Sequence, residues 1–256
     1  MSSRYLITGG CGSIGSALVK RLALKGNTVC SFDHNEEGLF KQIHSMPANI
    51  KNNVKTFVGD IRDLKRVEQA LNGVDYVYHC AALKHVELSE YNPFESLKTN
   101  VVGTNNILTA SIQASVKGVV ITSSDKAVNP SSTMGASKLL AERLVISSNS
   151  YIGDKPTKLS CVRFGNVWNT AGSVGQIFKE QCINNQNLTL TSEEMTRFFI
   201  SIESALDLCE YAMKNMLGGE IFVCDMGSLS IKDLAIRFQN KYKSSNKIKI
   251  IGIKPG

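Results

Sequence analysis

The sequence has no run of apolar residues that approaches the roughly 18 needed for a membrane-spanning helix. Its first residues lead almost directly into the apolar segment Tyr5-Leu6-Ile7. They lack the basic region, long apolar region and small-residue cleavage site of a secretory signal. These absences predict a soluble, cytoplasmic protein without a membrane span.

The seven cysteines are an odd, scattered set without any C-x-x-C pair. Cys30, Cys80 and Cys161 lie in apolar, strand-like runs, so we expect reduced thiols in the core rather than disulfides or zinc ligands. The four histidines also lack the spacing of metal ligands. We therefore predict no metal site.

The sequence also lacks a basic stripe interleaved with aromatic residues, the pattern typical of a nucleic-acid interface. Its net charge of +7 comes from basic residues that are dispersed along the chain. We expect no nucleic-acid partner, and the charge fits either an anionic small substrate or a solvated surface.

The composition that remains is ordinary for a globular protein: 256 residues, of which 43% are hydrophobic and 20% charged. A chain of this length buries a sizeable core, so we expect one domain, or one domain with a small appendage. Short apolar runs alternate with longer segments of helical periodicity. This alternation is typical of β-α-β units and predicts an α/β fold with a doubly wound parallel sheet of the Rossmann type.

The predicted strands of this sheet are residues 4–8, 28–32, 55–58, 76–80, 118–123 and 159–163. The predicted helices are residues 13–24, 64–71, 94–114 and 134–147. After residue 163 the pattern is looser, with predicted helices at 175–184 and 204–216, a strand at 221–224 and a helix-strand pair over 231–251. We expect an NAD-binding core over 1–165 and a small C-terminal substrate-binding region over 166–256, interleaved with the core, because no linker or repeat separates them.

A glycine-rich segment, GGCGSIG at residues 9–15, follows the first predicted strand and opens the first helix. Glycines at this place serve the tight turn, the close approach of backbone to a pyrophosphate, and helix-strand packing. The phosphates would lie at the helix N-terminus, which favours negative charge. We predict cofactor contacts here, with a structural turn as the alternative; the residues are Gly9, Gly12, Ser13, Ile14 and Gly15.

An acidic residue, Asp33, ends the second predicted strand, 18 positions beyond Gly15. A carboxylate there can accept hydrogen bonds from both ribose hydroxyls and would repel a 2′-phosphate, so we predict NAD in preference to NADP. The alternative is a solvated carboxylate. Asp60 and Ile61, at the end of the third strand, are predicted adenine contacts, with a plain turn as the alternative.

Several further segments recur in order across nearly the whole chain and together resemble one known family. They are AALKHV (81–86), EYNP (90–93), KTN (98–100), SSDKAVNP (123–130), MGASK (134–138), RFGNV (163–167), MTRF (195–198) and IGIKPG (251–256). The sequence resembles the nucleotide-sugar 4,6-dehydratase branch of the extended short-chain dehydrogenase/reductases. This is the polysaccharide-biosynthesis group whose members act on UDP-N-acetylglucosamine.

The resemblance implies a redox-neutral dehydration that makes a UDP-4-keto-6-deoxy amino sugar for a surface polysaccharide or glycan. Bound NAD takes hydride from C4, water leaves across C5 and C6, and the hydride returns to C6. The family pattern implies that Asp125 is the acid, Lys126 the base and Ser124 the residue that holds a sugar hydroxyl. An ordinary surface ion pair is the alternative for Asp125 and Lys126.

One position departs from the common short-chain dehydrogenase pattern. Lys138 lies one helical turn after Met134, a spacing that in most such enzymes carries lysine and tyrosine. The lysine then binds the nicotinamide ribose, whereas a thioether cannot exchange a proton. The proton of the 4-hydroxyl must therefore leave through Asp125, Lys126 or water. The sequence resembles a methionine-for-tyrosine subgroup of these dehydratases, and the alternative is a nucleotide-binding protein that has lost its chemistry.

The resemblance also implies contacts around the fourth strand. Ala81, Ala82 and Asn100 would lie near the cofactor, with a helix-packing amide as the alternative for Asn100. Lys84 and His85 follow the strand on its C-terminal edge and could face nicotinamide or sugar, or belong to a surface loop.

Asn166 and Arg197 resemble the residues that grip the sugar-pyrophosphate, and arginine suits bidentate phosphate contact. A surface ion pair is the alternative for Arg197. Chains of the family that the sequence resembles continue beyond the segment that ends at Gly256, so we expect the nucleotide pocket to be incomplete without that tail. The remaining hypotheses are a nucleotide-sugar 4-epimerase and a regulatory protein that senses NAD. We also expect a homo-oligomer.

Overall fold

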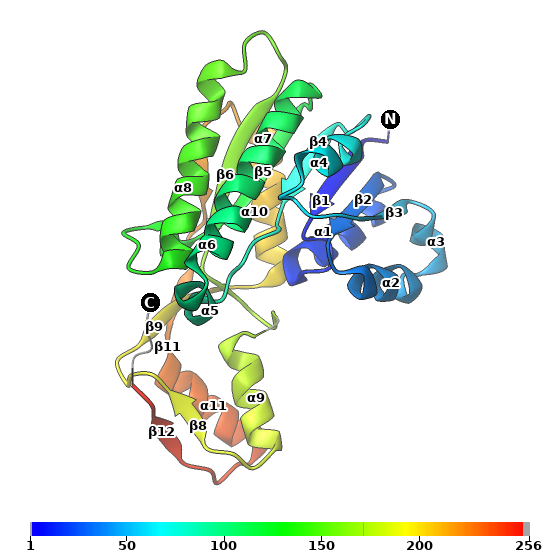
Figure 1. Ribbon diagram of the computed structural model, residues 1–256. Helices are drawn as coiled ribbons and strands as arrows, with labels where there is room; N and C mark the ends of the chain where they lie inside the picture. The colour runs from blue at the N-terminus through cyan, green and yellow to red at the C-terminus, as the bar shows by residue number, and fades with distance from the viewer. Residues whose placement is uncertain (1, 171, 253–256) are drawn as a thin grey trace.

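The computed structural model describes residues 2–170 and 172–252. A seven-stranded sheet, in which all neighbouring strands run parallel, forms its main body, with the order β10-β6-β5-β4-β1-β2-β3 (Figure 1). The strands are β1 (Arg4–Thr8), β2 (Thr28–Asp33), β3 (Val54–Val58), β4 (Tyr76–His79), β5 (Gly118–Ser124), β6 (Lys158–Phe164) and β10 (Ile221–Val223). The predicted doubly wound sheet is confirmed.

Helices cover both faces of this sheet, as its apolar strands require. Along β1, Leu6 and Ile7 enter separate cores because successive side chains point to opposite faces. α1 (Ser13–Leu24) and α10 (Ile202–Asn215) contribute to the core around Ile7, whereas α4 (Leu64–Ala70), α7 (Gly103–Gln113) and α8 (Thr133–Ser148) contribute to the core around Leu6. The other α-helices of this part are α2 (Glu36–Ser45), α3 (Ala48–Lys51), α5 (Val86–Tyr91) and α6 (Pro93–Ser96).

The single helix predicted over residues 94–114 is wrong in detail. The structure has α6, then a π-helical stretch, η1 (Leu97–Val102), and then α7. A π-helical turn is one widened turn within continuous helical backbone. Hydrophobic periodicity cannot register it, because the apolar residues on either side keep helical spacing.

The chain after residue 165 divides between two places. α10 and β10 join the main body, whereas the other elements form a smaller lobe below it in Figure 1. This lobe has a three-stranded sheet, a two-stranded parallel pair and two helices around Phe178 and Leu234. Its elements are β7 (Asn166–Val167), α9 (Val174–Ile183), β8 (Leu188–Leu190), β9 (Thr196–Ile200), β11 (Gly227–Ser230), α11 (Ile231–Tyr242) and β12 (Ile248–Ile250).

Two properties of the described residues bear on the sequence predictions. Within residues 2–170 and 172–252, no helix is long and apolar enough to cross a membrane. The same part of the chain contains no group of three or more histidine, cysteine or acidic side chains placed to hold a metal. The last part of the IGIKPG segment, residues 253–256, lies outside the described residues.

Candidate active site

The order of the strands in the sheet reverses beside the glycine-rich segment. The chain winds outward from β1 in both directions, through β2 and β3 on one side and β4 and β5 on the other. Ligands of such folds bind outside the carboxyl ends of the strands where this order reverses. β1 and β4 are the strands at that point, and the segments that follow them carry most of the predicted cofactor residues.

The glycines of residues 9–15 have separate structural tasks. Gly9 has a φ of +64°, and a Cβ there would lie 2.7 Å from the backbone nitrogen of Ala81. A Cβ on Gly15 would lie 2.1 Å from the carbonyl oxygen of Gly9, so Gly15 packs helix against loop. Gly12 is the N-cap of α1 and provides no side-chain cap, whereas Ser13 and Ile14 form the first turn. The loop therefore offers a phosphate close access to backbone N–H groups.

Asp33 fixes this loop from the end of β2. Its carboxylate is 8% exposed and accepts hydrogen bonds from the backbone N–H groups of Cys11 and Asn35, each at 3.0 Å. Burial and the neighbouring carboxylate of Asp33 raise the pKa of the Cys11 thiol to about 12. Each carboxylate oxygen has a second lone pair, so the group can still accept from a ribose hydroxyl. The glycine loop, the uncapped helix and Asp33 fit a dinucleotide.

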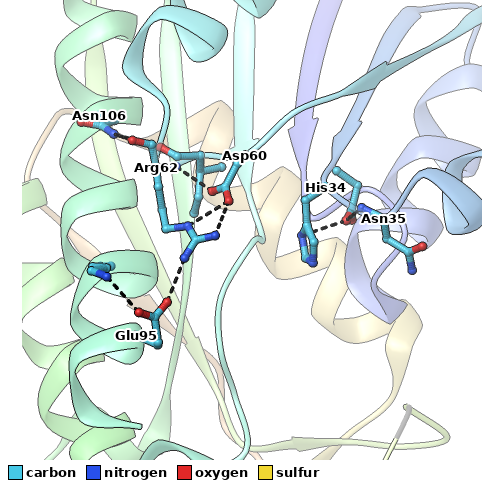
Figure 2. A network of polar contacts seen from close by, with 9 residues as sticks. His34, Asn35, Asp60, Arg62, Glu95 and Asn106 are labelled. Atoms are coloured by element: carbon cyan, nitrogen blue, oxygen red, sulfur yellow. Dashed lines mark hydrogen bonds and ion pairs between the residues drawn. The ribbon is translucent and has the colours of Figure 1, made fainter.

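A network of polar contacts follows the end of β3 (Figure 2). The carboxylate of Asp60 accepts from Nε and Nη2 of Arg62, at 2.8 and 2.6 Å, which lowers its pKa. Arg62 also binds Glu95 of α6 at 2.9 Å, and the amide of Asn106 donates to the carbonyls of Ile61 and Arg62 at 3.0 and 3.1 Å. Ile61 is itself buried in the core. If Asp60 contacts adenine as predicted, the carboxylate of Asp60 would bind adenine and Arg62 at the same time.

Asn100 holds the segment that follows β4 in place through hydrogen bonds. Its side chain is 1% exposed; its oxygen accepts from the backbone N–H of Leu83 at 2.8 Å. Its amide donates to the carbonyl of Leu83 and to Oγ of Ser137, both at 2.9 Å. Both amide donors are therefore used within the protein, and Asn100 holds the loop that contains Ala81 and Ala82 against α8.

Lys138 and Met134 lie one turn apart on α8, and both are buried. Nζ of Lys138 donates to the carbonyl oxygen of Thr122 on β5 at 2.9 Å. Burial lowers the pKa of Lys138 to about 8. The N-terminus of α8 is capped by Ser132, which accepts from Gly135 at 3.1 Å. The helix thus fixes a buried ammonium group close to the end of β5.

The predicted reactive residues come together beyond β5. Oγ of Ser124 donates to Oδ1 of Asp125 at 2.9 Å, and Nζ of Lys126 lies 3.1 Å from the same oxygen. Nζ of Lys126 also contacts Oδ1 of Asn166, from β7, at 3.5 Å. A 3₁₀ turn, η2 (Asp125–Ala127), directs these side chains, and Ser124 caps it by accepting from the N–H of Lys126 at 3.2 Å.

Asp125, Lys126 and Arg197 line one cavity of about 360 Å³ between the main body and the smaller lobe. The remaining lining residues are Val86, Asn129, Ser131, Ser132, Thr196, Phe198 and Ser228. None of these residues was predicted to have a role. Four of them belong to the motifs AALKHV, SSDKAVNP and MTRF, whereas Ser131, Ser132 and Ser228 lie outside every motif. A larger cavity of about 640 Å³, between α10 and β10, contains none of the predicted site residues.

Lys84 and His85 are exposed residues that follow β4. His85 is the N-cap of α5, and a Cβ on Gly172 would lie 2.8 Å from its ring. Partial burial lowers the pKa of Lys84. Both residues precede Val86, which lines the cavity, so they lie at its edge rather than in its wall.

Sequence reasoning missed a buried acidic residue, Glu142, in the middle of α8. It is 1% exposed and binds Arg163 and Ser123. A glutamate is common on helix surfaces, and no local signal separates a buried one from an exposed one.

The fold and this arrangement of residues define an extended short-chain dehydrogenase/reductase. The chain belongs to the polysaccharide biosynthesis protein family, whose model matches residues 5–256. The family predicted from the sequence motifs is thereby confirmed.

Curated relatives carry differing names. A protein of Methanocaldococcus jannaschii, named an uncharacterized membrane protein, is 46% identical over 98% of this chain and 77% of its own length. A UDP-glucose 4-epimerase of Rickettsia akari is 39% identical over 98% of this chain and 74% of its own. A UDP-N-acetylglucosamine 4,6-dehydratase (inverting) of Campylobacter jejuni is 37% identical, with the same coverage of 98% and 74%.

Solved structures show the same fold. Pen from Bacillus thuringiensis superposes with a TM-score of 0.97 at 39% identity, covering 100% of this chain and 81% of that one. A dTDP-glucose 4,6-dehydratase from Streptomyces venezuelae with NAD bound has a TM-score of 0.88 at 21% identity, covering 98% and 85%.

Proposed function

We propose that this protein is an NAD-dependent nucleotide-sugar 4,6-dehydratase that converts UDP-N-acetylglucosamine to a UDP-4-keto-6-deoxy amino sugar. The observation that carries the proposal is the contact between Asp125 and Lys126 at a cavity that also contains Arg197. An adjacent acid and base beside an arginine suited to a diphosphate meet the demands of eliminating water from a nucleotide sugar. The relative named as a dehydratase, at 37% identity, supports this reaction.

NAD, when bound, would supply the hydride chemistry by accepting hydride from C4 of the sugar and returning it to C6. The backbone around Gly12 would hold its pyrophosphate, Asp33 its adenosine ribose and Lys138 its nicotinamide ribose. An ammonium group has three donors. Within residues 2–170 and 172–252, Nζ of Lys138 donates one hydrogen bond, to the carbonyl oxygen of Thr122, which leaves donors for a ribose. The negative charge of Asp33 favours NAD over NADP.

Asp125 and Lys126 form an ion pair. Transfer of one proton across their 3.1 Å contact gives a neutral amine and a carboxylic acid without changing the net charge. The amine of Lys126 then removes the C5 proton, which the 4-keto group makes acidic, and Asp125 protonates the departing 6-hydroxyl, which leaves as water. Lys126 is now an ammonium group, exchanges its protons with solvent and returns one of them to C5. The proton that left the 4-hydroxyl then recharges Lys126 and restores the ion pair.

The remaining residues position the sugar. Ser124 would hold a sugar hydroxyl, and Asn166 would keep Lys126 in place through its 3.5 Å contact. Met134 exchanges no proton, so the 4-hydroxyl proton leaves through Asp125, Lys126 or water. The smaller lobe, which is formed by part of residues 166–256, would bind the sugar-pyrophosphate through Arg197.

The proposal is tested by mass spectrometry of UDP-N-acetylglucosamine incubated in deuterated water with protein and NAD. We expect a product lighter by one water that carries one solvent deuteron, and no free NADH. Lys126→Ala should abolish this product while NAD binding persists. Lys117→Ala is the matched control, because Lys117 also pairs with an aspartate, Asp75 at 2.8 Å, but lies on the surface.

A 4-epimerase is the second candidate, supported by the Rickettsia akari relative at 39% identity. It would give a sugar of unchanged mass and altered chromatographic retention in the same experiment. Met134 argues against it, because exchange at C4 needs a proton donor and acceptor at that place. Unchanged substrate in protein that binds NAD would contradict both reactions and favour an NAD-sensing protein.

A further inference from the structure

The buried carboxylate of Glu142 joins three elements of the main body. Both of its oxygens are held by Arg163 on β6, Oε1 by Nε at 2.7 Å and Oε2 by Nη2 at 2.5 Å. Ser123 on β5 donates to Oε1 at 2.6 Å. Glu142 itself belongs to α8, so its carboxylate connects that helix to the carboxyl ends of two neighbouring strands.

These strand ends carry the proposed chemistry. Ser123 and Arg163 are directly opposite one another in the parallel register of β5 and β6. The next residue along β5 is Ser124, which binds Asp125 at 2.9 Å. The chain that leaves β6 reaches Asn166, which contacts Lys126. Any displacement of the carboxylate would therefore move both sides of the reactive cluster.

Glu142 also lies one helical turn after Lys138, on the same face of α8. The charged and titratable groups that face Lys138 are Glu142 on its own helix, His79 and Cys80 from β4 and its end, and Cys161 from β6. Burial raises the pKa values of both thiols, and burial together with Lys138 lowers that of His79, so all three groups are neutral near pH 7. Among these groups, Glu142 brings the negative charge.

We propose that Glu142 is a positioning residue, which through its ion pair with Arg163 sets the place and the charge of Lys138 and holds the strand ends that present the reactive cluster. The part that concerns Lys138 as a cofactor ligand rests on the proposed function. The part that concerns the charge of Lys138 is a property of the protein alone and can be measured without cofactor or sugar.

The experiment is an NMR titration of protein that contains lysine labelled with ¹³C at Cε, with the Lys138 signal assigned by its loss in Lys138→Arg. We expect a midpoint near pH 8 in the unmodified protein, from the lowered pKa of Lys138. Glu142→Gln removes a negative charge and should lower the midpoint by about one pH unit. Arg163→Gln leaves the Glu142 carboxylate uncompensated and should raise it.

Opposite shifts separate a positioning role from a merely structural one, since loss of packing would affect both variants in the same direction. Arg163→Gln alone keeps the test available should Glu142→Gln fail to fold. Glu90→Gln is the matched control: Glu90 accepts from Thr133 at the N-terminus of α8, at 2.6 Å, but does not face Lys138. Its Lys138 midpoint should equal that of the unmodified protein. Unshifted midpoints in Glu142→Gln and Arg163→Gln would overturn the proposal.

A second experiment extends the test to function. It measures NAD binding by fluorescence between about pH 6.5 and about pH 9, a range that spans the expected midpoint of about 8. At pH 8 a midpoint lowered by about one unit reduces the protonated fraction about fivefold, so Glu142→Gln should bind NAD about fivefold more weakly there. Glu142→Asp should restore part of this loss. Equal binding by Glu142→Gln and unmodified protein at pH 8 would overturn the role of Glu142 towards the cofactor. Failure of the unmodified protein to bind NAD would contradict the proposed function and leave the NMR result standing.

Discussion

The carboxylate of Asp33 accepts a hydrogen bond from the backbone N–H of Cys11 at 3.0 Å, which ties the end of β2 to the glycine loop after β1. Asp33 was predicted from the sequence as a ribose ligand. The structure adds that the same carboxylate shapes the loop that would hold the pyrophosphate. Cofactor preference and loop geometry therefore depend on one side chain.

Replacement of Asp33 tests this double dependence. Asp33→Asn keeps an oxygen that can accept from Cys11 or Asn35 but removes the negative charge. Because a like charge no longer opposes a 2′-phosphate, we expect the ratio of NAD to NADP affinity to fall by about tenfold or more. Fluorescence titration with both cofactors measures this ratio, with the surface variant Asp75→Asn as control. An unchanged ratio would contradict the assigned role.

Two glycines of the loop are expected to respond differently to alanine. A Cβ on Gly15 would meet the Gly9 carbonyl oxygen at 2.1 Å, so Gly15→Ala should lower the melting temperature and abolish NAD binding together. A Cβ on Gly12 would meet that oxygen at 3.2 Å, a much milder contact. Gly12→Ala should therefore fold with nearly unchanged stability and still lose affinity for NAD, because the methyl group occupies the path of the pyrophosphate.

Calorimetric melting and NAD titration of both variants check this separation. Gly227→Ala is the control for the loss of a glycine, because a Cβ there meets nothing within 4 Å. Equal loss of stability in Gly12→Ala and Gly15→Ala would show that Gly12 is needed only for folding.

Arg197 is expected to act on substrate binding. It lines the same cavity as Asp125 and Lys126, and one of its N–H groups donates to the carbonyl of Thr196 at 3.0 Å. Hydrogen bonds to charged groups contribute about 1.5–3 kcal/mol, so Arg197→Ala should raise KM for UDP-N-acetylglucosamine by about tenfold to a hundredfold. Steady-state kinetics measure it, with Arg197→Lys expected to recover part of the loss. Arg237→Ala, at an exposed position on α11, should leave KM unchanged, and a fall in kcat alone for Arg197→Ala would exclude a binding role.

The main sheet could be predicted from the sequence because its signals are local. β5 is a buried central parallel strand that contains the apolar run of residues 119–121, and α1 starts directly after a glycine loop, so the structure matches both predictions closely. The smaller lobe was predicted less well. β7 has only two residues, Asn166–Val167, and its pairing with β9 depends on contacts distant in sequence.

In the site, too, residues that belong to a local motif were predicted, whereas a residue that depends on tertiary contacts was not. Ser124, Asp125 and Lys126 are consecutive, so one motif identified them. The structure places Oγ of Ser124 and Nζ of Lys126 at 2.9 and 3.1 Å from Oδ1 of Asp125. Glu142 was missed because its importance arises from its burial against Arg163, a residue 21 positions away. Tertiary burial of a polar side chain leaves no trace in a local pattern.

His79 lies beneath the glycine loop and is expected to make stability dependent on pH. Its ring is 2% exposed, with Nδ1 at 2.6 Å from Oγ1 of Thr8 and Nε2 at 3.1 Å from Oγ1 of Thr104. Burial and the nearby Lys138 lower the pKa of His79 from 6.5 to about 3. The folded protein therefore holds this ring in its neutral form.

The sign of the effect follows from this lowered pKa. Above pH 6.5 the ring is neutral in both the folded and unfolded states, and its contribution to stability is complete. As the pH falls from about 6.5 towards 3, the unfolded chain takes up a proton that the folded protein excludes. The free energy of unfolding should therefore fall by up to about 1.4 kcal/mol per pH unit from this group.

Urea unfolding of the unmodified protein and of His79→Asn between pH 7.5 and pH 5 measures this effect. The difference between the two free energies of unfolding isolates the contribution of His79, because all other groups titrate in both proteins. At pH 7 the variant should be less stable by about 1–3 kcal/mol, since it loses a buried hydrogen bond. Below pH 6.5 the difference should narrow steadily, because asparagine takes up no proton in either state. His44→Asn, at an exposed position on α2, should follow the unmodified protein throughout. Parallel curves for the unmodified protein and His79→Asn would mean that His79 is protonated in the folded state, and its hydrogen bonds to Thr8 and Thr104 would then need reassignment.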